Sequence, residues 1–83
     1  MFQVLILNSR PEAHDPIIYQ GTSRSVFLPG ETGEFEILDF HKPIISRLKK
    51  GSIVVDNEKE FRVQGGLMKM SHQNLVVMAE VSE

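Results

Sequence analysis

Cysteine is absent from the 83-residue sequence. Its absence excludes disulfide staples, thiolate zinc sites and cysteine nucleophiles, and it is typical of a protein of the reducing cytoplasm. Tryptophan is also absent and there is a single tyrosine, so the chain has little of the aromatic surface that lines a sugar-binding groove. The fold must therefore be held by packing, with or without a partner.

Long apolar runs and a strong charge of one sign are missing as well. No segment approaches the roughly 20 apolar residues that span a bilayer, and residues 1–7 lack the basic region and cleavage site of a signal peptide. The net charge of −2 argues against nucleic acid as a partner, because phosphate contacts need a clustered basic face. The composition, 41% hydrophobic and 24% charged residues, is typical of one small globular domain, which we expect to occupy residues 1–83.

Short apolar runs with period-two spacing predict an all-β fold. Phe2, Val4 and Ile6 alternate with residues of the opposite face at the start of the chain, and Phe35 and Ile37 do so near its middle. Turn-forming residues recur about every ten positions, which is the spacing of a β-sandwich. We therefore expect two packed sheets of short strands.

Two hairpins are predicted in the second half of the chain, where strand-forming runs are joined by turn residues. One spans residues 52–64 and turns at 56–59, and the other spans residues 67–78 and turns at 71–74. Residues 42–50 are ambiguous, because the stretch is too short for its periodicity to decide between one helical turn and an irregular crossover. The predicted core, with two sheets about 10 Å apart, consists of Val4, Ile6, Phe27, Phe35, Ile37, Ile45, Ile53, Val55, Phe61, Val63, Leu67, Val76 and Met78.

Residues that carry chemistry in other proteins are scattered here. His14, His41 and His72 have no second ligand at metal-binding spacing, so no metal site is predicted. Glu34 and Glu36 share a strand face and raise a hydrolytic acid/base pair as one interpretation. On an edge strand, however, such carboxylates are solvated charges that block association between edges. No serine is placed in a nucleophile motif, and we predict no catalytic residue and no cofactor.

Four glycines are interpreted as backbone features rather than as ligand sites. Gly30 and Gly33 are explained by tight turning, and Gly65 and Gly66 by a bulge or a close crossing of strands. Neither pair is a phosphate loop, because neither carries the lysine and Ser/Thr of a Walker sequence or opens a helix.

The charges are separated along the chain. Four carboxylates between residues 31 and 39 precede a basic stretch at residues 42–50, which indicates either two solvated edges of different sign or a docking surface. His41 lies between the two groups. It is either a histidine that titrates near neutral pH beside carboxylates or a loop histidine bonded to the backbone.

Four short segments are characteristic when they are taken together, because of their order along the chain and the spacing between them. They are residues 26–38 (VFLPGETGEFEIL), 41–45 (HKPII), 48–51 (LKKG) and 64–67 (QGGL). This set resembles the N-terminal β-sandwich domain of the epsilon subunit of F-type ATP synthases, and the resemblance covers nearly the whole chain. It implies a flattened β-sandwich of about ten short strands, in agreement with the turn spacing.

The resemblance also implies a rotor part that makes and breaks no bond. Family members lie at the foot of the central stalk and bind the gamma subunit on one side and the polar loops of the c-ring on the other. They turn with the rotor during proton-driven or sodium-driven ATP synthesis, on the cytoplasmic side of the inner (plasma) membrane. No cofactor and no homo-oligomer are implied, and attachment to the membrane is peripheral, through the complex.

Two segments match the parts of the family that face the ring. They comprise Gly30, Glu31, Thr32, Gly33, Glu34 and His41. The resemblance makes Glu34 and His41 the leading contact residues. Ring loops in the family present basic side chains, so an acidic edge would orient docking against them.

The sequence departs from the family at several positions. Glu36 stands where many relatives have glycine, Asp39-Phe40 stands where Pro-Gly is common, and Gln64 stands where serine usually precedes the paired glycines. Many relatives also continue past the position of Glu83 into a helical hairpin. The expectation is a short epsilon subunit without a C-terminal helical domain.

A binding module of another class fits the same composition. A free-standing β-sandwich adaptor would accept a peptide as an added strand along an exposed sheet edge. The two interpretations differ in whether the chain is recovered from its cell together with gamma and the catalytic α and β subunits.

Overall fold

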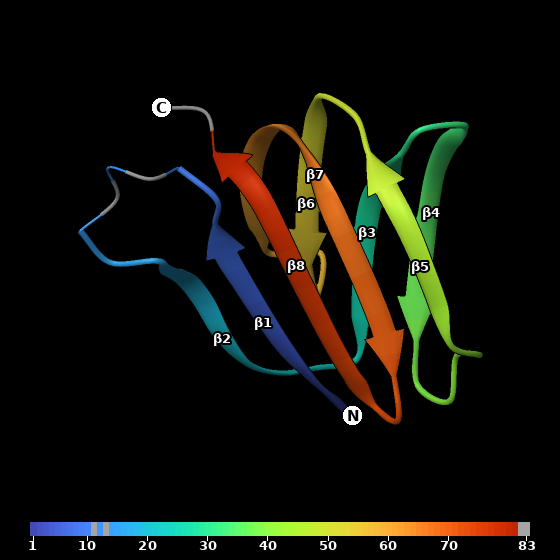
Figure 1. Cartoon of the computed structure of the whole chain (residues 1–83). Helices are drawn as coiled ribbons and strands as arrows, with labels where there is room; N and C mark the ends of the chain where they lie inside the picture. Colours follow the sequence, from blue (N-terminus) through green and yellow to red (C-terminus); the bar gives the residue numbers. More distant parts are fainter. Residues whose placement is uncertain (11, 13, 82–83) are drawn as a thin grey trace.

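A computed structural model describes residues 1–10, 12 and 14–81 of the chain, and these residues form strands without any helix (Figure 1). None of the described residues therefore belongs to a helix that could cross a bilayer. The eight strands are β1 (Phe2–Asn8), β2 (Ile17–Ser23), β3 (Ser25–Gly30), β4 (Gly33–Leu38), β5 (Ile44–Leu48), β6 (Gly51–Val55), β7 (Lys59–Ser71) and β8 (Asn74–Val81). The predicted all-β sandwich is confirmed, with eight strands rather than about ten.

Two segments account for differences from the predicted elements. Residues 44–48, which the sequence left between a helical turn and a crossover, form strand β5 because their backbone pairs with β7 from Ile44 opposite Met70 to Leu48 opposite Gly66. Residues 59–71, expected as parts of two hairpins, form one continuous strand of 13 residues, β7. Both hairpin turns are present at the ends of this strand.

The strands form two layers that share β7. The large layer has the order β2-β1-β8-β7-β5, and the small layer contains β4, β3, β6 and the first part of β7. In Figure 1 the large layer lies in front, the small layer lies behind it, and β7 arches over the top from one layer to the other. Strand β1 pairs in parallel with β8, which brings the two ends of the chain into adjacent strands.

Gly65 and Gly66 lie where β7 passes between the layers. The pairing with β8 shifts register between Val63 and Gly65, so a β-bulge occurs at this point. Gly65 has a φ of 156°, in the range that favours glycine. A Cβ atom on Gly66 would lie 2.3 Å from the carbonyl oxygen of Met78. Both glycines therefore permit the bend and the close approach of β8.

The core between the layers is closely packed and apolar. Its buried side chains are Phe2, Val4, Ile6, Val26, Leu28, Ile37, Leu48, Ile53, Val55, Val63, Met68, Met70, Leu75, Val77 and Ala79. Among the predicted core residues, Val4, Ile6, Ile37, Ile53, Val55 and Val63 are confirmed. Phe27, Phe35 and Phe61 are half-buried, and the last two pack against the margin of the core.

Four predicted core residues are wrong, and all four lie in the large layer. Ile45, Leu67, Val76 and Met78 are exposed, whereas Met68, Met70, Leu75, Val77 and Ala79 are buried. A shift of one residue exchanges the two faces of a strand, and here both faces are apolar. The charged residues decide between them: Lys69 and Glu80 point to water, so their immediate neighbours along the strand point inward.

Candidate docking surface

The outward-facing side of the large layer is apolar over several strands. Leu67 on β7 lies opposite Met78 on β8, Met78 lies beside Leu7 on β1, and Leu7 lies opposite Ile17 on β2. Ile45 on the flanking strand β5 is 66% exposed, and Leu67 and Met78 are 48% and 49% exposed. We call this surface the outer apolar face, which consists of Leu5, Leu7, Ile17, Ile45, Leu67, Val76 and Met78.

An apolar surface of this extent is uncommon on a protein that works alone. Scattered exposed hydrophobic residues are ordinary, but contiguous patches mark interaction sites. Permanent interfaces are also more apolar than transient ones. The outer apolar face is therefore the strongest candidate for a docking surface among the described residues.

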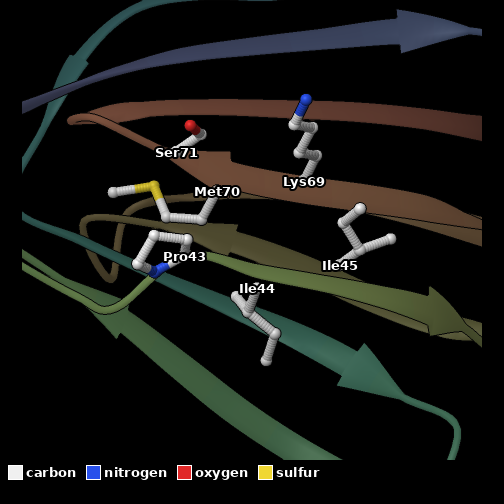
Figure 2. A pocket seen from close by; sticks show the side chains of 6 residues that line it. All are labelled: Pro43, Ile44, Ile45, Lys69, Met70 and Ser71. Carbon is white, nitrogen blue, oxygen red and sulfur yellow. The ribbon is translucent and has the colours of Figure 1, made fainter.

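A shallow groove of about 350 Å³ lies at one end of this face, between β5 and β7 (Figure 2). Ile45 and Lys69 are cross-strand neighbours there, as are Ile44 and Met70. The full lining consists of Pro43, Ile44, Ile45, Lys69, Met70 and Ser71. The groove offers apolar contact and one ammonium group, which suits the side chain of a partner.

The predicted ring-facing turn is a two-residue connection between β3 and β4. Gly30 and Gly33 pair with each other across it, and Gly33 has a φ of 145°. A Cβ atom on Gly30 would lie 2.6 Å from the carbonyl oxygen of Gly33, so no larger residue fits without a shift of the backbone. Glu31, Thr32 and Glu34 are exposed.

Acidic and basic residues meet at this end of the molecule. The backbone N–H of Glu31 donates to the carbonyl of Arg47 at 3.2 Å, and that of Lys49 donates to the carbonyl of Pro29 at 2.8 Å. The carboxylate of Glu31 and the ammonium groups of Lys49 and Lys50 thus extend from adjacent turns. Acidic and basic residues that are separated along the sequence are therefore carried by adjacent backbone segments at this end of the molecule.

His41 follows the end of β4 at Leu38, so it lies at the other end of that strand from the turn. β4 has six residues, which span about 17 Å at the usual rise of a strand. The Nδ1 atom of His41 lies 2.7 Å from the carbonyl oxygen of Lys42, and its backbone N–H donates to the carbonyl of Leu38 at 3.2 Å. The structure therefore does not bring His41 together with the turn, and its recorded partners are backbone carbonyls.

A hydrogen-bonded cluster next to His41 was not predicted from the sequence. The α-ammonium group of Met1 lies 2.7 Å from the Oδ1 atom of Asp39. The Nε2 atom of Gln73 donates to the same oxygen at 3.1 Å, and its Oε1 atom accepts the backbone N–H of Phe40 at 2.9 Å. The hydrogen bond from the α-ammonium group, with that from Gln73, lowers the pKa of Asp39 below its usual value.

Phe40 is held by this cluster in a left-handed conformation, with a φ of 62°. Its side chain is 86% exposed. The departure from Pro-Gly at residues 39–40 was the available signal, because glycine adopts a left-handed φ at little cost and phenylalanine does not.

The hydrolytic interpretation of Glu34 and Glu36 gains no supporting arrangement. Glu36 accepts a hydrogen bond from the hydroxyl of Ser25 at 2.5 Å. Ser25 lies on the neighbouring strand β3, so this carboxylate is engaged in a contact between strands. In the described part of the chain, no three carboxylate or histidine side chains come together as a set that could hold a metal ion.

The sequence matches the family described as ATP synthase, Delta/Epsilon chain, beta-sandwich domain, over residues 13–83. It is 36% identical over 69 residues to the ATP synthase epsilon chain of Delftia acidovorans, an alignment that covers 78% of this chain and 50% of that protein. It is 35% identical over 69 residues to ATP synthase epsilon chain 2 of Ralstonia nicotianae, with the same coverage of the two proteins. The chain thus spans about half the length of the curated relatives it matches.

Solved structures share the fold. A chain of the central stalk and c-ring structure of Tetrahymena thermophila mitochondrial ATP synthase gives a TM-score of 0.69 at 13% identity, covering 93% of this chain and 61% of that one. A chain of the OSCP/F1/c-ring structure of Euglena gracilis mitochondrial ATP synthase gives 0.71 at 16% identity, covering 96% and 52%. From the sequence match and the shared sandwich together, the chain belongs to the family of ATP synthase delta/epsilon chains, whose β-sandwich domain it carries.

Proposed function

We propose that this chain is a non-catalytic subunit of the central stalk of a rotary ATP synthase, joining the gamma shaft to the c-ring on the cytoplasmic side of the membrane. The observation that carries the proposal is the outer apolar face, because a contiguous exposed apolar surface marks a site where a partner binds. Membership of the delta/epsilon family indicates that the partner is another subunit of an ATP synthase.

The outer apolar face is assigned to the gamma subunit. A rotor part must stay on its shaft while torque passes through it, and permanent contacts of this kind are large and apolar. The adjacent strands β1, β8 and β7 offer such a contact. The shared strand β7 and the interdigitated core resist deformation, because close-packed interiors transmit strain.

The ring contact is assigned to the turn and to the edge strand β4. The proposed contact residues are Gly30, Glu31, Thr32, Gly33 and Glu34 at one end of β4 and His41 at the other. Since these ends lie about 17 Å apart, the ring loops would run along β4 rather than meet a single point. The mixed charges beside the turn favour polar loops over an apolar surface.

The proposal is tested by recovering the chain from its cell under native conditions. Native mass spectrometry should show it in one complex with gamma and with the catalytic α and β subunits. A chain recovered without these subunits, and instead bearing a peptide along β4 or β2, would support the strand-addition adaptor, because β4 and β2 end the strand order.

The ring contact has its own test. Glu34→Lys should leave the unfolding midpoint unchanged, because the side chain is exposed, while proton pumping driven by ATP hydrolysis in membrane vesicles falls by about twofold or more. Glu58→Lys, an equal charge change on the exposed turn between β6 and β7, is the control. Unchanged pumping in the Glu34 variant would remove Glu34 from the contact.

A further inference from the structure

Lys69 carries a positive charge within the outer apolar face, at the end where the groove lies. Its cross-strand neighbours are Ile45 on β5 and Val76 on β8, both of them exposed and apolar. Leu67 precedes it by two positions on the same face of β7. Figure 2 shows Lys69 beside Ile45 at the margin of the groove. An ammonium group is thus flanked on three sides by apolar side chains suited to contact a partner.

Water is the partner of this ammonium group in the isolated chain. The ion pairs found in the described part of the chain involve the α-ammonium group of Met1 and the side chain of Arg10, and none of them includes Lys69. Lys69 is exposed. Nothing within the described residues therefore neutralises its charge.

Covering the face removes that water. A buried ammonium group without a counter-charge opposes association, whereas one that meets a carboxylate adds specificity. A lysine at the rim of an interface extends its charge into solvent. Across the strands Lys69 is an interior position of this layer, since β5 flanks it on one side and β8, β1 and β2 on the other, and along β7 it lies two residues before the end of the strand at Ser71.

We infer that the shaft surface that covers the outer apolar face carries a carboxylate opposite Lys69, next to an apolar side chain that fills the groove between β5 and β7. This inference rests on the proposed function. The pair fixes how the chain is positioned on the shaft, because sliding by one strand would place the carboxylate against Ile45 or Val76 instead. Arg47, opposite Leu67, adds charge of the same sign nearby.

Binding of the full chain to the gamma subunit encoded in the same genome tests the inference. At about 0.05 M and about 0.5 M salt, Lys69→Met should weaken binding at least about tenfold and flatten its salt dependence, because the carboxylate of the partner is left unpaired. Lys69→Arg should retain binding to within about threefold. Arg62→Met, on the part of β7 that belongs to the small layer, should bind as the wild type does.

A carbodiimide crosslink would identify the carboxylate opposite Lys69 directly. The reagent joins a lysine amine to a carboxylate in contact with it, so the complex should yield a peptide that links Lys69 to an Asp or Glu of the shaft. Tighter binding by Lys69→Met, with no such crosslink, would overturn the inference and leave the proposed function standing. Failure of the folded wild-type chain to bind gamma at all would instead contradict the proposed function.

Discussion

Phe40 shows how single residues at one end of the molecule are constrained. A left-handed backbone at a non-glycine residue costs about 1–2 kcal/mol, and the hydrogen bond from its N–H to Gln73 helps to offset that cost. Gln73 itself has a φ of 63°. Two adjacent turns therefore stabilise each other through one side chain.

Asp39 gives this cluster a predicted pH dependence. Its pKa is lowered in the folded chain, chiefly by the hydrogen bond from the α-ammonium group of Met1. A lowered pKa means that the carboxylate stabilises the fold above the unfolded value of 3.8, and that this contribution is lost as the pH falls through the folded value.

Asp39→Asn should therefore lower stability at neutral pH and reduce the loss of stability on acidification. The measurement is urea denaturation at several values from about pH 6 to about pH 2. Glu58→Gln, at an exposed turn position, is the control. Parallel curves for the wild type and Asp39→Asn over this range would contradict the assignment.

Strand β7 is the element on which the architecture depends. It pairs with β6 in the small layer and with β5 and β8 in the large layer, and it changes layer at Gly65 and Gly66. Gly66→Ala should lower the free energy of unfolding by about 3 kcal/mol, because its Cβ atom would meet the backbone of β8.

Gly21→Ala provides the matched control for that prediction. A Cβ atom on Gly21 would approach only the side chain of Tyr19, at 3.1 Å, and a side chain at a strand margin can move. Thermal or chemical denaturation should separate the two variants by about 2 kcal/mol. Equal effects would show that the close contact of β7 with β8 does not limit residue 66.

The strands themselves were largely predictable from the sequence. For three of them, however, the sequence did not show which face points to the core. Period-two spacing identified β1 and β4, and turn residues identified both hairpins, because local backbone preferences determine them. In β5, β7 and β8 both faces are apolar, so alternation alone could not separate core from surface. Lys69 and Glu80 carried the missing information, and the wrongly placed residues proved to form the candidate docking surface.

At the scale of the whole molecule, several features depend on contacts between segments that are distant along the chain, and the sequence alone did not reveal them. The parallel pairing of β1 with β8 joins strands from the two ends of the chain and has no local signal. The turn at residues 30–34 was predicted as part of the site, but its separation from His41 and its basic neighbours depend on how β3, β4 and β5 assemble. The outer apolar face likewise exists only after the large layer forms.

The most direct test of the docking surface is Met78→Glu, which places a carboxylate in the centre of the outer apolar face without touching the core. The substitution is made in the chromosomal gene for this chain, and the measurement is the amount of the chain in ATP synthase purified from those cells. Arg62→Glu is the control. We predict a chain that is folded to within about 1 kcal/mol of the wild type and at least about tenfold depleted from the complex. A folded Met78→Glu chain present at the wild-type level would contradict the account.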